Sequence, residues 1–112
     1  MQTTRQKKIS KLIQKEISLI FQKEKHDLLG NILVTVTSVK VTADLSISKI
    51  FLSIFPVKNP KETLDIINNN NKFYRNLLAR SLRHNLRKVP EIIFLLDDSA
   101  AYAEEIDRLL NK

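Results

Sequence analysis

The fold is decided by the stretch "ILVTVTSVKVTADLSISKIFLSIFP" (Ile32 to Pro56), in which two runs rich in β-branched residues flank a short polar segment. Both runs roughly alternate apolar and polar residues, which is the pattern of β-strands with one buried face. The segment "TADLS" (Thr42 to Ser46) between them contains turn-forming residues. The stretch therefore predicts an antiparallel hairpin. In its second strand we expect Ile50, Leu52 and Ile54 on one face and Lys49, Phe51 and Ser53 on the other.

Helices are predicted on both sides of this hairpin. From Thr4 to about Lys25 the apolar residues recur at helical spacing, which indicates an amphipathic helix capped by Thr3 or Thr4. After the hairpin, the spacing from Leu64 to Val89 is also helical. Asparagine competes with helical backbone bonds, so we expect a kink or break near Asn70 to Lys72. One long, bent helix is the alternative.

The rest of the chain completes one domain. Pro90 disfavours helical geometry at Val89 and is expected to end the second basic helix there. The run "EIIFLL" (Glu91 to Leu96) predicts a third strand, and the residues after it predict a short helix capped by Asp98 or Ser99. The expected fold is α+β, a single domain over residues 1–112 in the order α-β-β-α-kink-α-β-α. A three-stranded sheet packs against the helices.

Positive charge is concentrated in two parts of the chain, whose net charge is +7. Residues 1–26 contain seven Lys or Arg and two acids, and residues 72–88 contain six and none. Residues 91–112 reverse the balance, with six acids and two basic residues. A basic face of this kind favours binding to a polyanion, most simply nucleic acid.

Composition argues against several other classes of protein. Cysteine is absent, which excludes disulfides, thiolate nucleophiles and cysteine-based zinc sites. His26 and His84 have no carboxylate at metal-ligand spacing, so we predict no metal, no cofactor and no enzymatic activity. No apolar run is long enough to span a membrane, and we expect a cytoplasmic protein. A membrane-surface role for the helix from Thr4 to Lys25 is an alternative, although that helix lacks Trp.

Two sets of basic residues are candidate nucleic-acid contacts: the first lies in the N-terminal helix, and the second lies between Lys72 and Lys88. No acid lies within the second set for pairing along a helix, and arginine can hold phosphate with two parallel hydrogen bonds. The first set is weaker, because Glu16 and Glu24 offer local partners. Its earliest members are alternatively an N-terminal arm that orders on RNA. For both sets, a merely solvated helix face is the competing interpretation. The sets are Arg5, Lys7, Lys8, Lys11 and Lys15, then Lys72, Arg75, Arg80, Arg83, Arg87 and Lys88.

One aromatic residue lies on the polar face of its predicted strand. Phe51 has either of two roles there: it stacks on a base, as aromatic residues on open sheets do, or a neighbouring helix covers it. Tyr74 in the basic segment is expected to be a core residue.

Three blocks of the sequence resemble the ribosome-binding factor A family. "RQKKISKLIQKEISLIFQKE" (Arg5 to Glu24) resembles the opening helix of that family, and "VTVTSVKVTADLSISKIFLSIF" (Val34 to Phe55) resembles its "V…V..DLS.AK" hairpin. "LRKVPEIIFLLDDS" (Leu86 to Ser99) resembles its "R.VPEL.F..DDS" block. The blocks lie in register through nearly the whole chain, and the order of elements is similar to a type II KH domain.

The resemblance implies a bacterial ribosome assembly factor. Such a factor binds the immature 30S small ribosomal subunit, assists late maturation and 5′-end processing of its 16S rRNA, and is released before translation. It is not an enzyme, and the family is linked to growth in the cold. The implied partners are the small ribosomal subunit and 16S rRNA, with no membrane, cofactor or small-molecule substrate, and we expect a monomer. Another KH-like RNA- or DNA-binding protein is the alternative.

The sequence departs from the family pattern between the two central helices. With one glycine, the chain has no Gly-x-x-Gly loop of the kind that clamps a nucleic-acid backbone in KH domains. The family instead has an Ala-x-Gly kink, and the corresponding positions here are Asn70-Asn71-Lys72. Asparagine tolerates left-handed backbone angles, which would keep a kink possible. Many members also carry a charged C-terminal tail, of which this sequence has almost none.

Overall fold

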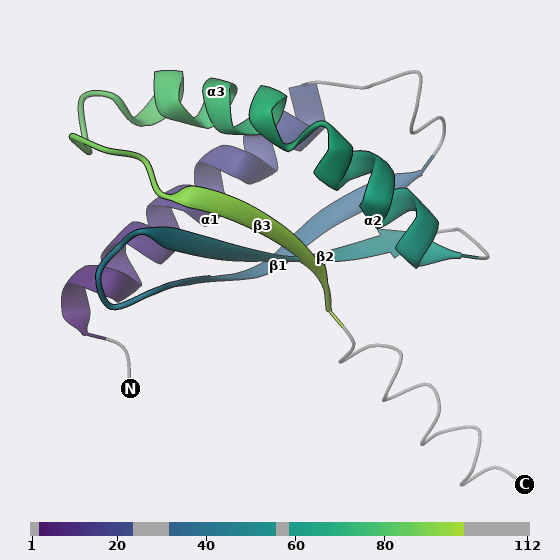
Figure 1. Ribbon diagram of the computed structural model, residues 1–112, viewed down its shortest axis with the longest axis horizontal. Helices are drawn as coiled ribbons and strands as arrows, with labels where there is room; N and C mark the ends of the chain where they lie inside the picture. The colour runs from purple at the N-terminus through teal and green to yellow at the C-terminus, as the bar shows by residue number, and fades with distance from the viewer. Residues whose placement is uncertain (1–2, 24–31, 56–58, 98–112) are drawn as a thin grey trace, which may run out of the picture.

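The computed structural model describes residues 3–23, 32–55 and 59–97. Three helices lie on one face of a three-stranded sheet (Figure 1), which confirms the α+β prediction. The C-terminal helix predicted after the third strand lies outside the described residues. Among the described helices, none is both long and apolar enough to cross a membrane. The elements are α1 (Thr4–Lys23), β1 (Leu33–Val41), β2 (Ile47–Phe55), α2 (Pro60–Asn69), α3 (Asn71–Leu82) and β3 (Glu91–Leu96).

The sheet has the order β1-β2-β3. β1 and β2 form the predicted antiparallel hairpin, and β3 pairs with β2 in the parallel direction. The register shifts between Val36 and Ser38, where one extra residue forms a β-bulge. Because of this shift, Val36 and Val39 both face the core although they are three residues apart.

A single apolar core lies between the sheet and the helices. An aromatic cluster at its centre joins three elements: the Phe21 ring at the end of α1 lies 4.8 Å from the Tyr74 ring at the start of α3 and 5.7 Å from the Phe94 ring of β3. Tyr74 and Phe94 also meet edge to face, with 5.6 Å between their ring centroids. Tyr74 is therefore a core residue, as predicted. The inward strand residues Ile50, Leu52 and Ile54 are buried, also as predicted.

Thr3 caps α1, and the cap is tied to the sheet. The backbone N–H of Gln6 donates to the Thr3 hydroxyl, and the backbone N–H of Thr3 donates to the Gln6 side-chain oxygen. This reciprocal pair is a capping box. The Gln6 amide nitrogen also donates to the carbonyl of Val41, at 2.9 Å, so a buried glutamine connects the start of α1 to the end of β1.

The predicted break between α2 and α3 is present at Asn70. The backbone of Asn70 has φ −104° and ψ 18°, which is not left-handed, so the left-handed geometry considered from the sequence is wrong for this residue. The Asn70 side chain instead donates to the carbonyl of Ile66, at 2.8 Å, and its backbone N–H donates to the carbonyl of Ile67. These two bonds satisfy carbonyls at the end of α2 that a helix otherwise leaves unpaired. The break therefore needs no glycine.

Three polar side chains from α2 and α3, which we call the edge row, hold the edge of β3 that faces away from β2. They are Asn68, Asn71 and Arg75, whose spacing places them on one side of the helical segment. Asn68 bonds Phe94 twice: its amide donates to the Phe94 carbonyl at 3.0 Å, and the Phe94 N–H donates to its side-chain oxygen at 3.2 Å.

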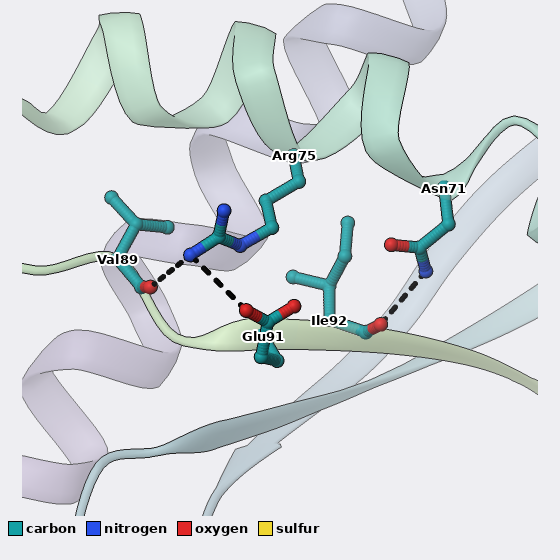
Figure 2. A network of polar contacts seen from close by, with 5 residues as sticks. All are labelled: Asn71, Arg75, Val89, Glu91 and Ile92. Carbon is teal, nitrogen blue, oxygen red and sulfur yellow. Dashed lines mark hydrogen bonds and ion pairs between the residues drawn. The ribbon is translucent and has the colours of Figure 1, made fainter.

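The other two members act further toward the start of β3. The Asn71 amide donates to the carbonyl of Ile92 at 2.7 Å, and an Arg75 guanidinium nitrogen donates to the carbonyl of Val89 at 3.1 Å (Figure 2). An unpaired strand edge exposes backbone groups that attract another chain. The edge row satisfies these groups from within the molecule.

Replacing Asn68 with alanine is expected to lower the free energy of unfolding by about 1–3 kcal/mol, because two backbone groups of the buried Phe94 lose their partner. Urea denaturation measures this change. Asn69→Ala is the matched control: Asn69 is exposed, ends the same helix, and is expected to change stability by less than about 0.5 kcal/mol. Equal effects of the two substitutions would contradict the role of the edge row.

The hairpin turn is organised around Asp44. One oxygen of its carboxylate accepts hydrogen bonds from the hydroxyls of Thr42 and Ser46, at 2.8 and 2.7 Å, and from the backbone N–H of Ser46. These bonds, the one from the Ser46 side chain foremost, lower the pKa of Asp44 from 3.8 to about 2. The turn also holds Leu45 at a positive φ of 62°, which is costly for a side chain of this size. Leu45 packs on the core, which offsets part of that cost.

Asp44→Asn is expected to destabilise the protein at neutral pH and to flatten its loss of stability in acid. The pKa of Asp44 is lowered in the folded state, so its carboxylate stabilises the fold above its unfolded pKa of 3.8, and this contribution is lost as the pH falls through about 2. Urea denaturation across that range measures the effect. Asp65→Asn, at an exposed position on α2, is the control. The prediction fails if Asp44→Asn and Asp65→Asn lose stability in parallel with the unmodified chain.

Candidate nucleic-acid interface

The outward face of α1 is basic. Lys7, Lys8, Lys11 and Lys15 are exposed along the side of α1 opposite the buried isoleucines. Arg5 is also exposed, and the structure places it within the helix, so the predicted set does not form an arm outside α1. The nearby acid Glu16 does not form an ion pair with these residues in the part of the chain that the structure describes.

The second basic segment is only partly helical, which corrects the sequence interpretation. α3 ends at Leu82, whereas the pattern predicted a helix up to Val89. The backbone N–H groups of Asn85 and Leu86 both donate to the carbonyl of Leu82, at 2.8 and 2.9 Å, and turn the chain out of the helix. Leu86 and Val89 then pack back on the core. Periodicity could not show this, because Val89 reaches the core from a loop.

The helix therefore carries only part of the second predicted set of basic residues, and three of the six members of that set lie beyond α3. Lys72 and Arg80 are exposed on α3 and lie two turns apart, with exposed Asn76 between them. Arg83 is the residue at the C-terminal cap of α3. The two other residues, Arg87 and Lys88, are exposed in the loop that leads to β3. Arg80 and Arg83 lie at the negative end of the helix dipole, which stabilises basic side chains there.

Arg75 differs from the other predicted contacts because its side chain points toward the sheet. One guanidinium nitrogen donates to the Val89 carbonyl and lies 3.4 Å from the Glu91 carboxylate (Figure 2). The side chain is 30% exposed, compared with 69% for that of Glu91. Arg75 thus fastens the start of β3, and only a minor part of it faces solvent. The sequence places Glu91 sixteen residues after Arg75, a separation at which no helical pairing rule applies.

The two basic segments extend toward the same end of the domain. Phe21, near the end of α1, contacts Tyr74 in the first turn of α3, so the two helices run in opposite directions. The N-terminal half of α1 and the end of α3 with its loop accordingly lie on the left in Figure 1. Residues 3–23 and 71–90 contain a single acid, Glu16. The surface of these two segments, which we call the basic helical layer, is therefore strongly positive and suited to a polyanion.

The described part of the chain does not bring together a group that suggests metal binding. Among residues 3–23, 32–55 and 59–97, no three His, Asp or Glu side chains are placed to hold a metal ion. His84 is exposed among the basic residues of the loop after α3.

Fold and charge together define a class: a small α+β domain, with helices on one face of its sheet and a basic helical layer, typical of proteins that bind nucleic acid. The comparisons identify the family. Residues 5–110 match the family model of ribosome-binding factor A. The chain belongs to the ribosome-binding factor A family.

Curated relatives agree along nearly the whole chain. Ribosome-binding factor A of Flavobacterium johnsoniae is 42% identical over 98% of this chain and 85% of its own length. The Cytophaga hutchinsonii protein is 40% identical over 100% of this chain and 84% of its own length.

Solved structures show the same fold. The crystal structure of ribosome-binding factor A from Thermus thermophilus superposes with a TM-score of 0.67 at 20% identity, covering 81% of this chain and 94% of that one. The solution structure of the Thermotoga maritima protein, a putative ribosome-binding factor A, gives 0.65 at 25% identity, over 85% and 89%. A Thermus thermophilus homology model, fitted into the cryo-electron microscopy map of a 30S complex, gives 0.62 at 21%, over 78% and 89%.

Arg75→Ala is expected to lower the free energy of unfolding by about 1–2 kcal/mol, because the Val89 carbonyl loses a charged donor. The exposed pair with Glu91 contributes little to this value. Chemical denaturation is the measurement, and Arg80→Ala on the same helix is the matched control, with an expected change under about 0.5 kcal/mol. If Arg75→Ala and Arg80→Ala are equally stable, Arg75 does not fasten β3.

Proposed function

We propose that this protein binds the immature 30S small ribosomal subunit through its 16S rRNA, assists late maturation and 5′-end processing of that rRNA, and is released before translation begins. In this proposal it acts in the cytoplasm as a monomer, and it binds and remodels RNA without catalysing a reaction. The observation that carries the proposal is the excess of positive charge on α1, α3 and the loop after α3, in a chain of the ribosome-binding factor A family.

The rRNA contacts are assigned to the exposed basic residues of the layer. Each ammonium or guanidinium that meets a phosphate releases counterions, which favours binding at low salt. The Thermus thermophilus relative fitted into a map of a 30S complex supports the choice of partner. Arg75 is assigned a positioning role, since its guanidinium is engaged with Val89. The assigned contacts are Arg5, Lys7, Lys8, Lys11, Lys15, Lys72, Arg80, Arg83, Arg87 and Lys88.

Assistance without catalysis has a simple physical form in this proposal. A protein shifts the equilibrium between two RNA conformations only by binding one of them more tightly. A stiff basic layer, whose helices are held by the aromatic cluster and the edge row, would prefer the rRNA conformation whose phosphates match its charges. Release follows when maturation removes that conformation, because the affinity difference then disappears.

Charge reversal at the end of α3 tests this assignment. Arg80→Glu combined with Arg83→Glu is expected to abolish co-sedimentation with immature small subunits, because two phosphate contacts become repulsive. Circular dichroism should remain unchanged, and thermal unfolding should shift only slightly, since both side chains are exposed and lose only their interaction with the α3 dipole. The single variant Arg83→Glu has a control with the same change of charge. This control is Lys61→Glu, at an exposed position in the first turn of α2. Lys61→Glu is expected to bind normally.

The salt dependence of binding is a second measurement on the same variants. Each lost phosphate contact should reduce the slope of log affinity against log salt by about one. Unchanged co-sedimentation of the double variant, or an equal loss with Lys61→Glu, would rule out this assignment of the contacts.

A further inference from the structure

The sheet has a second face, which the described helices leave open. All three described helices pack on the other side (Figure 1), and Phe51, which alternates with the buried Ile50 and Leu52, faces away from them and is half-buried. At the free end of the hairpin, Leu33 and Phe55 lie directly opposite each other and are 64% and 70% exposed. Ile93 of β3 is 41% exposed. An open sheet face that carries two phenylalanines and other apolar side chains is a surface that normally has a binding partner.

The same face carries two neighbouring positive charges. Lys40 of β1 and Lys49 of β2 are direct partners in the sheet register, and both are exposed. Like charges in this position destabilise a sheet. In the described ranges neither lysine forms an ion pair. The ammonium of Lys40 lies 5.8 Å from the centre of the Phe51 ring, so charge and aromatic surface adjoin. An anion bound between the two lysines would relieve their repulsion.

These features select among possible occupants. A second copy packed face to face would bury the two lysines of each copy in the interface, and burying charges without partners is costly, which disfavours a dimer through this face. Duplex RNA keeps its bases stacked on one another and cannot place them on protein rings. Unpaired RNA provides flat bases for the phenylalanines and phosphates for the lysines, the combination found in single-strand binding surfaces.

We propose that the open face of the sheet binds an unpaired stretch of RNA, with bases stacked on Phe51 and Phe55 and phosphates held by Lys40 and Lys49. The two rings lie four residues apart on one strand, about 13 Å, and would therefore contact separate bases. The inference rests on the proposed function, because it assumes that the natural ligand is rRNA. It adds a second contact, on the side of the domain opposite to the basic helical layer.

A tryptophan reporter tests the face directly. The chain contains no tryptophan, so Phe55→Trp introduces a single fluorophore at the most exposed of the two rings. Titration with a single-stranded oligouridine of about 12 nucleotides is expected to quench its emission as a base stacks on the indole. Fluorescence anisotropy of labelled RNA follows binding independently. Binding without quenching overturns the proposal, because the RNA would then be held elsewhere.

A second experiment removes the aromatic rings of Phe51 and Phe55. Phe51→Leu with Phe55→Leu keeps the face apolar and should weaken binding of the oligouridine about tenfold or more, with unchanged thermal stability. Ile93→Leu, on the same face, is the control and should bind normally. Lost stability with unchanged RNA affinity overturns the proposal and indicates that a protein segment, such as the acidic residues after β3, occupies the face.

The lysines give a signature that a structural role would not. Lys40→Gln with Lys49→Gln should weaken RNA binding and raise thermal stability at low salt, because their repulsion is removed. Unchanged affinity overturns the proposal. Two different measurements distinguish failure of the proposed function from failure of this proposal about the sheet face. The Arg80 and Arg83 reversal tests the proposed function, whereas oligouridine binding by the sheet variants tests this face alone.

Discussion

The backbone edge of β3 is the constraint on which the rest of the molecule depends. Within the described structure β3 has one neighbouring strand, so the N–H and carbonyl of Phe94 point away from the sheet and need partners. Asn68 supplies both, and Asn71 and Arg75 continue the row toward the start of the strand. To reach that edge, α2 and α3 must lie along it with one polar side turned inward. The outward side of α3 then follows from geometry, and it is the side that carries Lys72 and Arg80.

This constraint explains which features could be predicted from the sequence. The alternation of the hairpin and the apolar run of β3 depend on neighbours in the chain, and the structure confirms all three strands within one residue at each end. No local pattern could show that Arg75, unlike Arg80, binds the start of β3, because its partners Val89 and Glu91 lie in a loop and strand that follow much later. The end of α3 was missed for a similar reason: Val89 is buried, as the helical pattern required, but it reaches the core from a loop.

The asparagines from Asn68 to Asn71 affect more than the local helix, because two of them contact a strand that is distant in the sequence. Their low preference for helices correctly indicates a break. Asn68 and Asn71, however, form hydrogen bonds with the backbone of β3 and not with the break. Only Asn70 serves the break itself, through its bond to the carbonyl of Ile66. The edge row has one sequence signal: Asn68, Asn71 and Arg75 recur at helical spacing in the helices that precede the apolar strand β3. It becomes interpretable only when the strand is known to lie at a sheet edge.

The break at Asn70 forms without the glycine that the resemblance leads us to expect between the two central helices. A left-handed residue turns the chain through its own backbone, whereas Asn70 stays in an ordinary region and closes the end of α2 with its side chain. The backbone N–H groups of Phe73 and Tyr74 both donate to the Asn70 carbonyl, which starts α3 at once. One residue therefore ends one helix and begins the next. Because Tyr74 is anchored in the aromatic cluster and Asn71 on β3, the direction of α3 is fixed within its first turn. The positions of Lys72 and Arg80 on α3 follow from that direction. At Asn70, a specific side-chain hydrogen bond ends α2 where a flexible glycine would otherwise be needed.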